Sequence, residues 1–355
     1  MLINTPTRPE PGAPPLRANL YSDTQTRPTA AMKAAMMAAE LGDEQHGDDP
    51  TIHALCDRMA ALLGKEAALF LPSGTMCNEI AILVHCQRGD EVLAHETAHI
   101  LAAEGGAPAA LAGVSVLGLP GARGQFDAAT LRAAFRERRR HAPPQTLVEI
   151  EQTANLGGGT VWPLDRLRAV CDVAHEAGMA VHMDGARLMN AVVAAGVPAI
   201  EMAAGCDTVW LDFTKGLGAP LGAVLCGTAS FIDRAWLWKQ RMGGALRQGG
   251  ICAAACLYAL DHHVDRLVED HANAAALARG LAQIAGITVE TPETNLVFFD
   301  TTATGVTATE LARRVRLAGV QISTMGRFRG RACTHLDVDR AGVDLAIASV
   351  RAALA

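Results

Sequence analysis

The chain is organised around the segment Val209–Gly222, which reads VWLDFTKGLGAPLG. It begins as a short apolar run typical of a buried strand and ends in a turn with three glycines and one proline. Lys215 lies at the junction, where the strand shields its amine and Gly216 leaves room beside it. A partly desolvated lysine is suited to act as a nucleophile, although a surface lysine at a strand end would give the same local pattern.

On both sides of this segment, short apolar runs alternate with helical segments from about residue 67 to residue 226. This alternation predicts an α/β domain whose mainly parallel sheet is covered by helices on both faces. Beyond about residue 255, strands and helices alternate on a smaller scale. We therefore predict a proline-rich N-terminal arm at 1–19, a large domain at 20–254 and a small C-terminal α+β domain at 255–355.

The composition indicates a soluble globular protein with ample apolar material for a core. The chain has 355 residues, 50% of them hydrophobic, with a net charge of −6 and a pI near 6.1. This charge argues against a nucleic-acid partner, and no apolar stretch reaches membrane-spanning length. Nine cysteines are scattered without the spacing of a zinc or redox motif, which favours reduced thiols in the cytoplasm.

Polar residues follow four of the predicted strands. They are Ser73-Gly74-Thr75 at a helix start, His99, Asp184 and Lys215. Because ligands of open α/β sheets bind at the carboxyl ends of the strands, we expect these residues to share one site. Each has an ordinary structural explanation by itself: a helix cap, a strand-end ion pair between Asp184 and Arg187, or a surface lysine.

Their order along the chain predicts a pyridoxal 5'-phosphate site. A helix N-terminus can hold the phosphate, a carboxylate can keep the pyridine nitrogen protonated, and a lysine can form the Schiff base. Asp184 and Lys215 lie in this order after Ser73-Gly74-Thr75, and the His99 ring can stack on the cofactor. The three-part order is more specific than any one part.

Further short motifs run from about Leu20 to the C-terminus. They are Ser22-Asp23-Thr24, Thr26-Arg27-Pro28, Gly47-Asp48-Asp49-Pro50-Thr51, Gly64-Lys65-Glu66-Ala67-Ala68, Ser73-Gly74-Thr75, Asp184-Gly185-Ala186-Arg187, Lys215-Gly216-Leu217-Gly218-Ala219-Pro220, Arg247-Gln248 and Thr334-His335-Leu336-Asp337. Together they resemble the low-specificity threonine aldolases, within the β-eliminating lyase branch of the aspartate-aminotransferase-like fold. This resemblance implies fold type I with a mainly parallel seven-stranded sheet, and a homotetramer with active sites at subunit interfaces.

The resemblance also implies roles for individual residues. Lys215 would bind the cofactor covalently and Asp184 would pair with the pyridine nitrogen. His99 would stack on the ring, while Gly74 and Thr75 hold the phosphate. Residues implied at the cofactor are Ser73, Gly74, Thr75, His99, Asp184, Arg187, Lys215 and Arg247, the last reaching in from a neighbouring subunit.

For the substrate carboxylate the resemblance implies Ser22, Arg187 and Arg331, a guanidinium fork being suited to that group. Arg327 and Arg329 lie close enough in sequence to be confused with Arg331. The implied reaction removes the β-hydroxyl proton of L-threonine, L-allo-threonine or a related amino acid, aryl ones included. Cleavage of Cα–Cβ then gives an aldehyde and, after protonation, glycine.

The chain departs from the family pattern across the pocket. Ala154 stands where relatives commonly have a histidine, His46 replaces a tyrosine or similar ring, and Ala103 replaces a bulky residue. The base for the β-hydroxyl is therefore His99, an ordered water, or His46 from a neighbouring subunit. Smaller residues here could admit larger aldehydes.

Three alternatives stay open. A different fold type I reaction, such as β-elimination or transamination, would use the same cofactor site. A non-catalytic binding protein would have no chemical need to keep Lys215, Asp184 and His99 together. Finally, His95-Glu96-Thr97-Ala98-His99 matches the H-E-x-x-H pattern of zinc proteases, but it starts at a strand end and lacks a third ligand, so we expect no metal.

Overall fold

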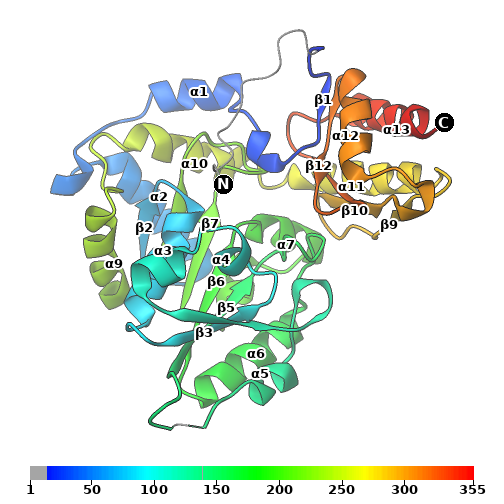
Figure 1. The fold of residues 1–355 in the computed structure, drawn as a ribbon. Coiled ribbons are helices and arrows are strands. Elements are labelled where there is room, and N and C mark those ends of the chain that lie inside the picture. The colour runs from blue at the N-terminus through cyan, green and yellow to red at the C-terminus, as the bar shows by residue number, and fades with distance from the viewer. Residues whose placement is uncertain (1–13, 138) are drawn as a thin grey trace.

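The computed structural model describes residues 14–137 and 139–355. A large lobe contains the main sheet, and a smaller lobe holds the C-terminal helices and strands (Figure 1). Most of the predicted N-terminal arm lies outside the described residues. In the described part of the chain, no helix is both long and apolar enough to cross a bilayer.

The large lobe is built on the predicted seven-stranded, mainly parallel sheet, in the order β2-β8-β7-β6-β5-β3-β4. Only β8 runs antiparallel to its neighbours. The strands are β2 (Ala67–Leu71), β3 (Glu91–His95), β4 (Ser115–Leu119), β5 (Gln145–Glu151), β6 (Ala180–Gly185), β7 (Thr208–Asp212) and β8 (Ala223–Gly227).

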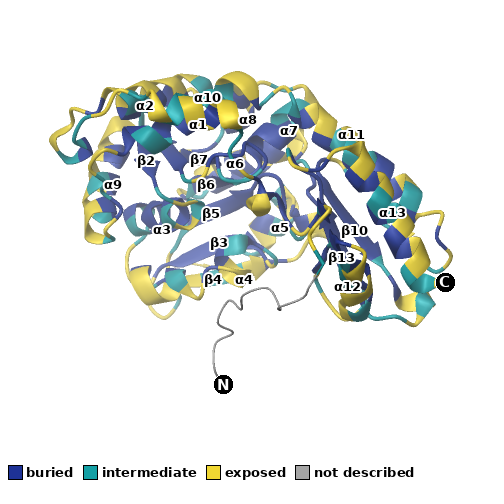
Figure 2. Ribbon diagram, turned by 90° about the horizontal axis from the view of Figure 1, so that it is seen from above, coloured by how far each residue is buried: buried dark blue, intermediate teal, exposed yellow. Residues whose placement is uncertain are grey.

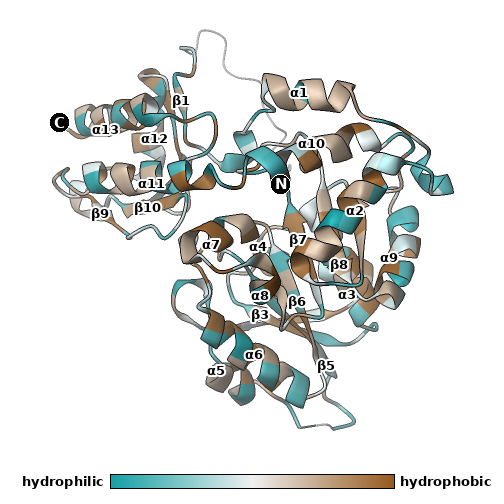
Figure 3. Cartoon of the chain, turned by 180° about the vertical axis from the view of Figure 1, so that it is seen from behind, coloured by the Kyte–Doolittle hydropathy of each residue, from teal (hydrophilic) through white to brown (hydrophobic). Residues whose placement is uncertain are grey.

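Helices cover both faces of this sheet. On one face, α3 (Gly74–His85) and α9 (Ala229–Arg241) pack against the odd-numbered residues of β2 and β8. On the other, α2 (Pro50–Leu63), α6 (Leu164–Glu176) and α10 (Gly250–His262) enclose the main core. The sheet is buried while the outer faces of the helices are exposed, and the hydrophobic residues follow the same division (Figures 2 and 3). The remaining helices of this lobe are α1 (Ala30–Met37), α4 (His99–Ala102), α5 (Ala128–Ala133), α7 (Leu188–Ala195) and α8 (Ala199–Ala203).

The strand register places polar side chains in two rows beneath α3. Glu151 of β5 pairs with Asp184 of β6, which pairs with Trp210 of β7. One row below, Glu149 lies beside His182, and His182 beside Thr208. Because side chains of a strand alternate between faces, both rows point to the same side of the sheet, at its carboxyl edge.

The small lobe has a core of its own. Its antiparallel sheet has the order β12-β13-β10-β9, packed with α11 (Leu267–Leu281), α12 (Ala308–Leu317) and α13 (Arg340–Leu354). These strands are β9 (Thr288–Val289), β10 (Leu296–Asp300), β12 (Ser323–Thr324) and β13 (Arg329–Cys333). β1 (Ala18–Asn19) pairs with β11 (Val320–Gln321), so the first described strand joins the C-terminal core. The division at residues 20–254 and 255–355 stays a prediction.

Phe299 tests the core of the small lobe. It is 2% exposed, and a Cβ added at Gly330 on the paired strand would lie 2.4 Å from its ring. We expect Phe299→Ala to lower the free energy of unfolding by about 3–5 kcal/mol in a denaturant titration, because the cavity cannot close against a glycine. Phe328→Ala, at a half-buried position, is the control and should cost clearly less. Equal losses would contradict this account of the core.

Candidate active site

A cavity of about 350 Å³ opens at the carboxyl edge of the main sheet. It brings together all but two of the predicted site residues: Ser22, Ser73, Gly74, Thr75, His99, Asp184, Arg187, Lys215 and Arg331. Thr24, Glu151, Asn155, Ala186, Trp210, Asp212 and Thr214 complete its lining. The roles assigned to these residues stay predictions, whereas their convergence is a property of the fold.

The start of α3 forms one wall. Ser73 caps the helix, its hydroxyl accepting the N–H of Met76 at 3.3 Å. Among the described residues, the N–H groups of Gly74 and Thr75 have no acceptor, and free donors at a helix N-terminus favour an anion. A Cβ on Gly74 would lie 2.1 Å from the Trp210 ring, so glycine is needed for this close packing.

Lys215 follows β7, as the sequence indicated, and its amine is held by a neighbour that sequence analysis missed. Asp212, the last residue of β7, forms an ion pair with Lys215. The other Asp212 oxygen accepts the backbone N–H and the hydroxyl of Thr214, both at 2.8 Å. The Lys215 side chain is 20% exposed and its amine lies 5.8 Å from the centre of the Trp210 ring. The amine therefore faces the cavity.

Asp184 is buried at the base of the cavity. Its Oδ2 accepts the Asn78 amide at 2.8 Å, and its Oδ1 accepts the Ala186 N–H at 2.9 Å. Burial raises the pKa of Asp184, while the Asn78 hydrogen bond and the charges of His99 and Lys215 oppose that rise. A buried carboxylate that lacks a directly bonded cation is suited to receive one from a ligand.

Asn78 is fixed by a chain of hydrogen bonds that runs through the sheet face. The Trp210 indole can only donate, so the Asn78 oxygen, 2.6 Å away, must be the acceptor. His182 Nε2 therefore also donates to this oxygen, at 3.1 Å. His182 Nδ1 is left to accept from Thr208 at 2.9 Å, and the Thr208 hydroxyl accepts from His85 at 3.0 Å.

This chain of donors points toward the cavity. Burial lowers the pKa of His182 to about 3 and that of His85 to about 4, so both rings are neutral at physiological pH. The Asn78 amide group ends the chain and donates to two carboxylates, Asp184 and Glu104, each at 2.8 Å. An amide cannot pass a proton onward, so the chain orients these carboxylates without conducting protons.

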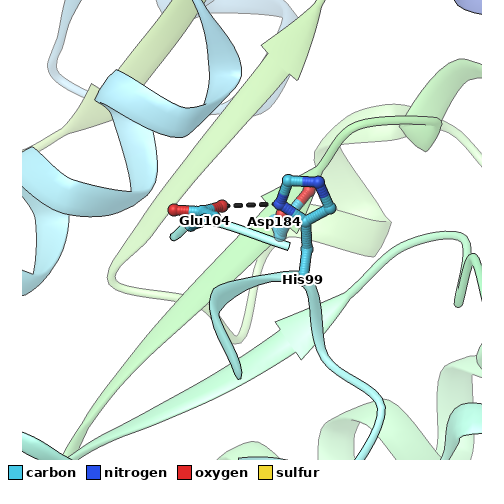
Figure 4. Close-up of side chains that lie close together, drawn as sticks. All are labelled: His99, Glu104 and Asp184. Carbon is cyan, nitrogen blue, oxygen red and sulfur yellow. Dashed lines mark hydrogen bonds and ion pairs between the residues drawn. The ribbon is translucent and has the colours of Figure 1, made fainter. Parts of the chain in front are cut away.

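His99 lies between the cavity and Glu104. The three side chains of His99, Glu104 and Asp184 converge (Figure 4). His99 Nδ1 lies 2.7 Å from Glu104 Oε1, and this hydrogen bond raises the pKa of His99. With Nδ1 occupied, Nε2 is the ring nitrogen that remains for a ligand.

The H-E-x-x-H pattern does not form a helical zinc site. His95 ends β3 and His99 begins α4, so the two rings do not share a helix. Both His95 nitrogens already have protein partners, the Thr97 hydroxyl at 2.8 Å and the Gly121 carbonyl at 3.0 Å.

Two guanidinium groups line the opposite wall. Arg187 bonds the buried Asp23 through Nε at 2.6 Å and through Nη2 at 2.7 Å. Burial alone would raise the pKa of Asp23, but the Arg187 charge holds this pKa well below its usual range. Nη1 of Arg187 and Nη1 of Arg331 both approach the Asn155 side-chain oxygen, at 3.4 and 3.2 Å. The two cations thus converge on one acceptor, as a bound carboxylate would require.

The neighbouring arginines are engaged elsewhere. Arg329 pairs with Glu290 at 2.9 Å, and Arg327 stacks on Phe328 with its guanidinium carbon 5.2 Å from the ring centre. Among these three arginines, the cavity takes in Arg331.

His46 and Arg247 lie outside the cavity, on one exposed surface of the same lobe. Asp43 joins them, 3.0 Å from Arg247 and 3.8 Å from His46, and their side chains are 60% and 76% exposed. Met37, 80% exposed, ends α1 just before this segment. If His46 or Arg247 contributes to an active site, it must therefore be the site of another copy of the chain.

Ala154 is buried against the turn at residues 122–124. A Cβ on Gly124 would lie 2.6 Å from the Ala154 methyl group, and Asn155, its neighbour, lines the cavity instead. A histidine at this position would need this turn to move. Ala103, the other small replacement, is exposed after α4.

The residues present fit pyridoxal 5'-phosphate. Free N–H groups at the start of α3 suit its phosphate, and the buried Asp184, which bonds only Asn78 and the Ala186 N–H among the described residues, could pair with a protonated ring nitrogen. A lysine amine faces the same space. The sheet, the small C-terminal lobe and this set of donors define an enzyme of the pyridoxal phosphate-dependent fold type I class.

Comparison with known proteins narrows this class. Residues 19–304 match the model of the beta-eliminating lyase family. The chain is 39% identical over 338 residues to the low specificity L-threonine aldolase of Escherichia coli K12, covering 95% of this chain and 99% of that one. It is 37% identical over 343 residues to low-specificity L-threonine aldolase 1 of Arabidopsis thaliana, covering 95% and 96%. The chain belongs to the beta-eliminating lyase family, with the threonine aldolases, and is a lyase.

The fold agrees with this membership. The structure of Leishmania major threonine aldolase superposes with a TM-score of 0.82 at 21% identity, covering 95% of this chain and all of that one.

Sequence analysis missed the residues that hold the predicted ones in place, which are Asp23, Asn78, Glu104, Asn155 and Asp212, and it missed Glu151 in the lining of the cavity. The sequence does indicate that two of the strands carry polar side chains into the site. VEIE in β5 and VHMD in β6 alternate apolar and polar residues inside otherwise buried strands. Such alternation in a sheet covered on both faces indicates a polar site on one of them.

Asn78 provides the test of this network. Asn78→Asp keeps the shape but directs a carboxylate at Asp184 and Glu104. We expect it to lower the free energy of unfolding by about 3–5 kcal/mol, as an uncompensated buried charge does, and to weaken cofactor binding measured by absorbance. If the variant keeps wild-type stability and cofactor affinity, the network does not hold Asp184.

Proposed function

We propose that this chain is a pyridoxal 5'-phosphate-dependent aldolase. It cleaves L-threonine, L-allo-threonine and related β-hydroxy-α-amino acids, aryl ones included, to glycine and an aldehyde, and catalyses the reverse addition. The observation that carries this proposal is one cavity that contains Lys215, Asp184, His99 and the start of α3. Close similarity to threonine aldolases over nearly the whole chain supports the choice of reaction.

The residues of the cavity would hold the cofactor at three of its groups. Lys215 would hold it covalently, Gly74 and Thr75 would donate N–H groups to its phosphate, and Asp184 would pair with its ring nitrogen. When bound, the cofactor supplies the electron sink that Cα–Cβ cleavage needs. Asn78 keeps the Asp184 carboxylate fixed for that pairing.

The substrate carboxylate lies against Arg331 and Arg187, with Ser22 beside them. Asp23 occupies two of the donor nitrogens of Arg187, so Arg187 offers its Nη1 while Arg331 supplies the other charge. Fixing the carboxylate orients the Cα–Cβ bond toward His99.

His99 takes the β-hydroxyl proton. Its Nδ1 donates to Glu104, which leaves Nε2 as the base, and the Glu104 carboxylate stabilises the imidazolium that forms. Because the Glu104 hydrogen bond raises the pKa of His99, the free-base form prevails only above that raised value. The rate should therefore fall on the acid side.

The active enzyme is a cytoplasmic homotetramer in which sites lie at subunit interfaces. The exposed surface around His46 and Arg247 supports this arrangement, since it carries the two family-implied residues that are absent from the cavity. In it, Arg247 reaches the phosphate of a neighbouring subunit's cofactor.

The assay that tests the activity uses L-threonine, L-allo-threonine and L-phenylserine separately, and measures aldehyde and glycine. We expect release from at least one of them, and loss of all release in Lys215→Ala. A keto acid with ammonia in place of aldehyde would instead identify β-elimination, and a keto acid without ammonia would identify transamination. Absence of aldehyde from all three substrates would refute the aldolase assignment.

The base assignment is tested by two substitutions. His99→Ala should lower kcat by about 10²–10⁴-fold, the usual contribution of general base catalysis. His46→Ala on the exposed surface should leave kcat nearly unchanged. If both variants stay near wild type, an ordered water is the base, and if His46→Ala alone is slow, the base comes from the neighbouring subunit.

The shared sites are tested by mixing two inactive variants. Lys215→Ala and Arg247→Ala, unfolded together and refolded, should regain part of the activity, because hybrid oligomers contain sites with both residues intact. Mixtures that stay as inactive as either variant alone would show that each site is complete within one chain.

A further inference from the structure

Behind His99, two buried glutamates face each other. Glu104 follows α4 and Glu79 lies in α3, and the two residues are 8% and 1% exposed. Burial raises the pKa of Glu79, and a side-chain hydrogen bond with Glu104 adds to this rise, so the two carboxyl groups are in contact. Yet neither oxygen of Glu79, nor Oε2 of Glu104, has a hydrogen-bond donor among the described residues. Two carboxylates in such contact cannot both be ionised in a buried site, so a proton lies between them.

The neighbours decide which glutamate keeps this proton. Glu104 Oε1 already accepts hydrogen bonds from His99 and Asn78, at 2.7 and 2.8 Å, so its negative charge is stabilised. Glu79 has no comparable donors in the described structure. We propose that Glu79 is a neutral carboxylic acid whose O–H donates to Glu104 Oε2, and that it is thereby a positioning residue that keeps Glu104 an anion behind His99.

This arrangement, which rests on the proposed function, explains how Glu104 can stabilise the positive charge that His99 gains when it acts as the base. With three donors, the carboxylate of Glu104 stays ionised while His99 Nε2 gains the substrate proton and Nδ1 keeps its own. Glu79 retains its proton throughout, and His99 Nε2 later returns the one it took. Burial raises the pKa of Glu79 to about 8, and the contact with Glu104 adds to the rise.

Other titratable groups surround the pair. Asn78 donates to both Asp184 and Glu104, and the His99 ring lies close to both carboxylates. Glu149 and Glu151 of β5 lie beside His182 and Asp184 on the same face of the sheet. Burial raises the pKa of Glu151 to about 8 and that of Glu149 well above its usual value. The experiment must therefore separate Glu79 from these carboxyl groups, and Glu149 provides the matched control.

Proton release on unfolding tests the protonation of Glu79 directly. Between about pH 5 and pH 8, a carboxyl group that is neutral when folded and ionised when unfolded releases one proton, so it makes stability fall as pH rises. Glu79→Gln should release one proton fewer than wild type at pH 6.5 to 7, roughly midway in this range. Equal release would show that Glu79 is ionised in the folded protein and would overturn the proposal, whatever reaction the enzyme catalyses.

The pH dependence of kcat in the holoenzyme tests the positioning role. Ionisation of Glu79 would remove the donor to Glu104 and place a second negative charge beside it, so we expect the wild-type kcat to fall as pH rises through the raised pKa of Glu79. Glutamine still donates a hydrogen bond but cannot ionise, so Glu79→Gln should keep the neutral-pH rate and move this alkaline fall to higher pH. Glu79→Leu, which removes the donor, should be slower at neutral pH. Glu149→Gln should release one proton fewer on unfolding but leave the alkaline fall in place. An alkaline fall unchanged in Glu79→Gln, or one shifted equally in Glu149→Gln, would refute the role of Glu79.

Discussion

The hydrogen bonds of Asn78 are the interaction on which the site depends. The Asn78 side-chain oxygen accepts hydrogen bonds from Trp210 and His182, and its NH₂ group donates to Asp184 and Glu104. A buried carboxylate is costly unless hydrogen bonds replace the water it has lost, and here one side chain serves two carboxylates at once. Asn78 therefore joins Asp184, which is proposed to pair with the cofactor ring, to Glu104, which bonds the proposed base His99.

This coupling requires the sheet register. Rows of side chains across β5, β6 and β7 bring Glu151, Asp184 and Trp210 into line, with Glu149, His182 and Thr208 one row below. A shift of one residue in any strand would turn its polar side chains into the opposite core, which is closely packed with hydrophobic residues. The apolar residues between the polar ones thus fix the geometry of the site as well as the stability of the fold.

The carboxyl groups beneath α3 also give the site its pH response. Glu79, Glu149 and Glu151 have raised pKa values because burial disfavours the charged form, whereas Asp23 is held ionised by Arg187. All of these acids are buried, and Asp23 differs from the glutamates in bonding a guanidinium fork. Burial thus keeps the unpaired carboxyl groups neutral, and pairing keeps Asp23 ionised.

The sequence by itself determined the fold class, the mainly parallel sheet and the residues proposed to contact the cofactor. It could do so because the strands that precede Ser73, Asp184 and Lys215 run in the same direction, so these residues come to one edge of the sheet. Only the tertiary structure decided what holds them: Asn78 to Asp184, Asp212 to Lys215, and Glu104 with Glu79 behind His99. The contact of Asp212 with Lys215 is local, whereas those of Asn78, Glu79 and Glu104 form only because α3 and the loop after α4 pack against a sheet built from segments far apart in the chain.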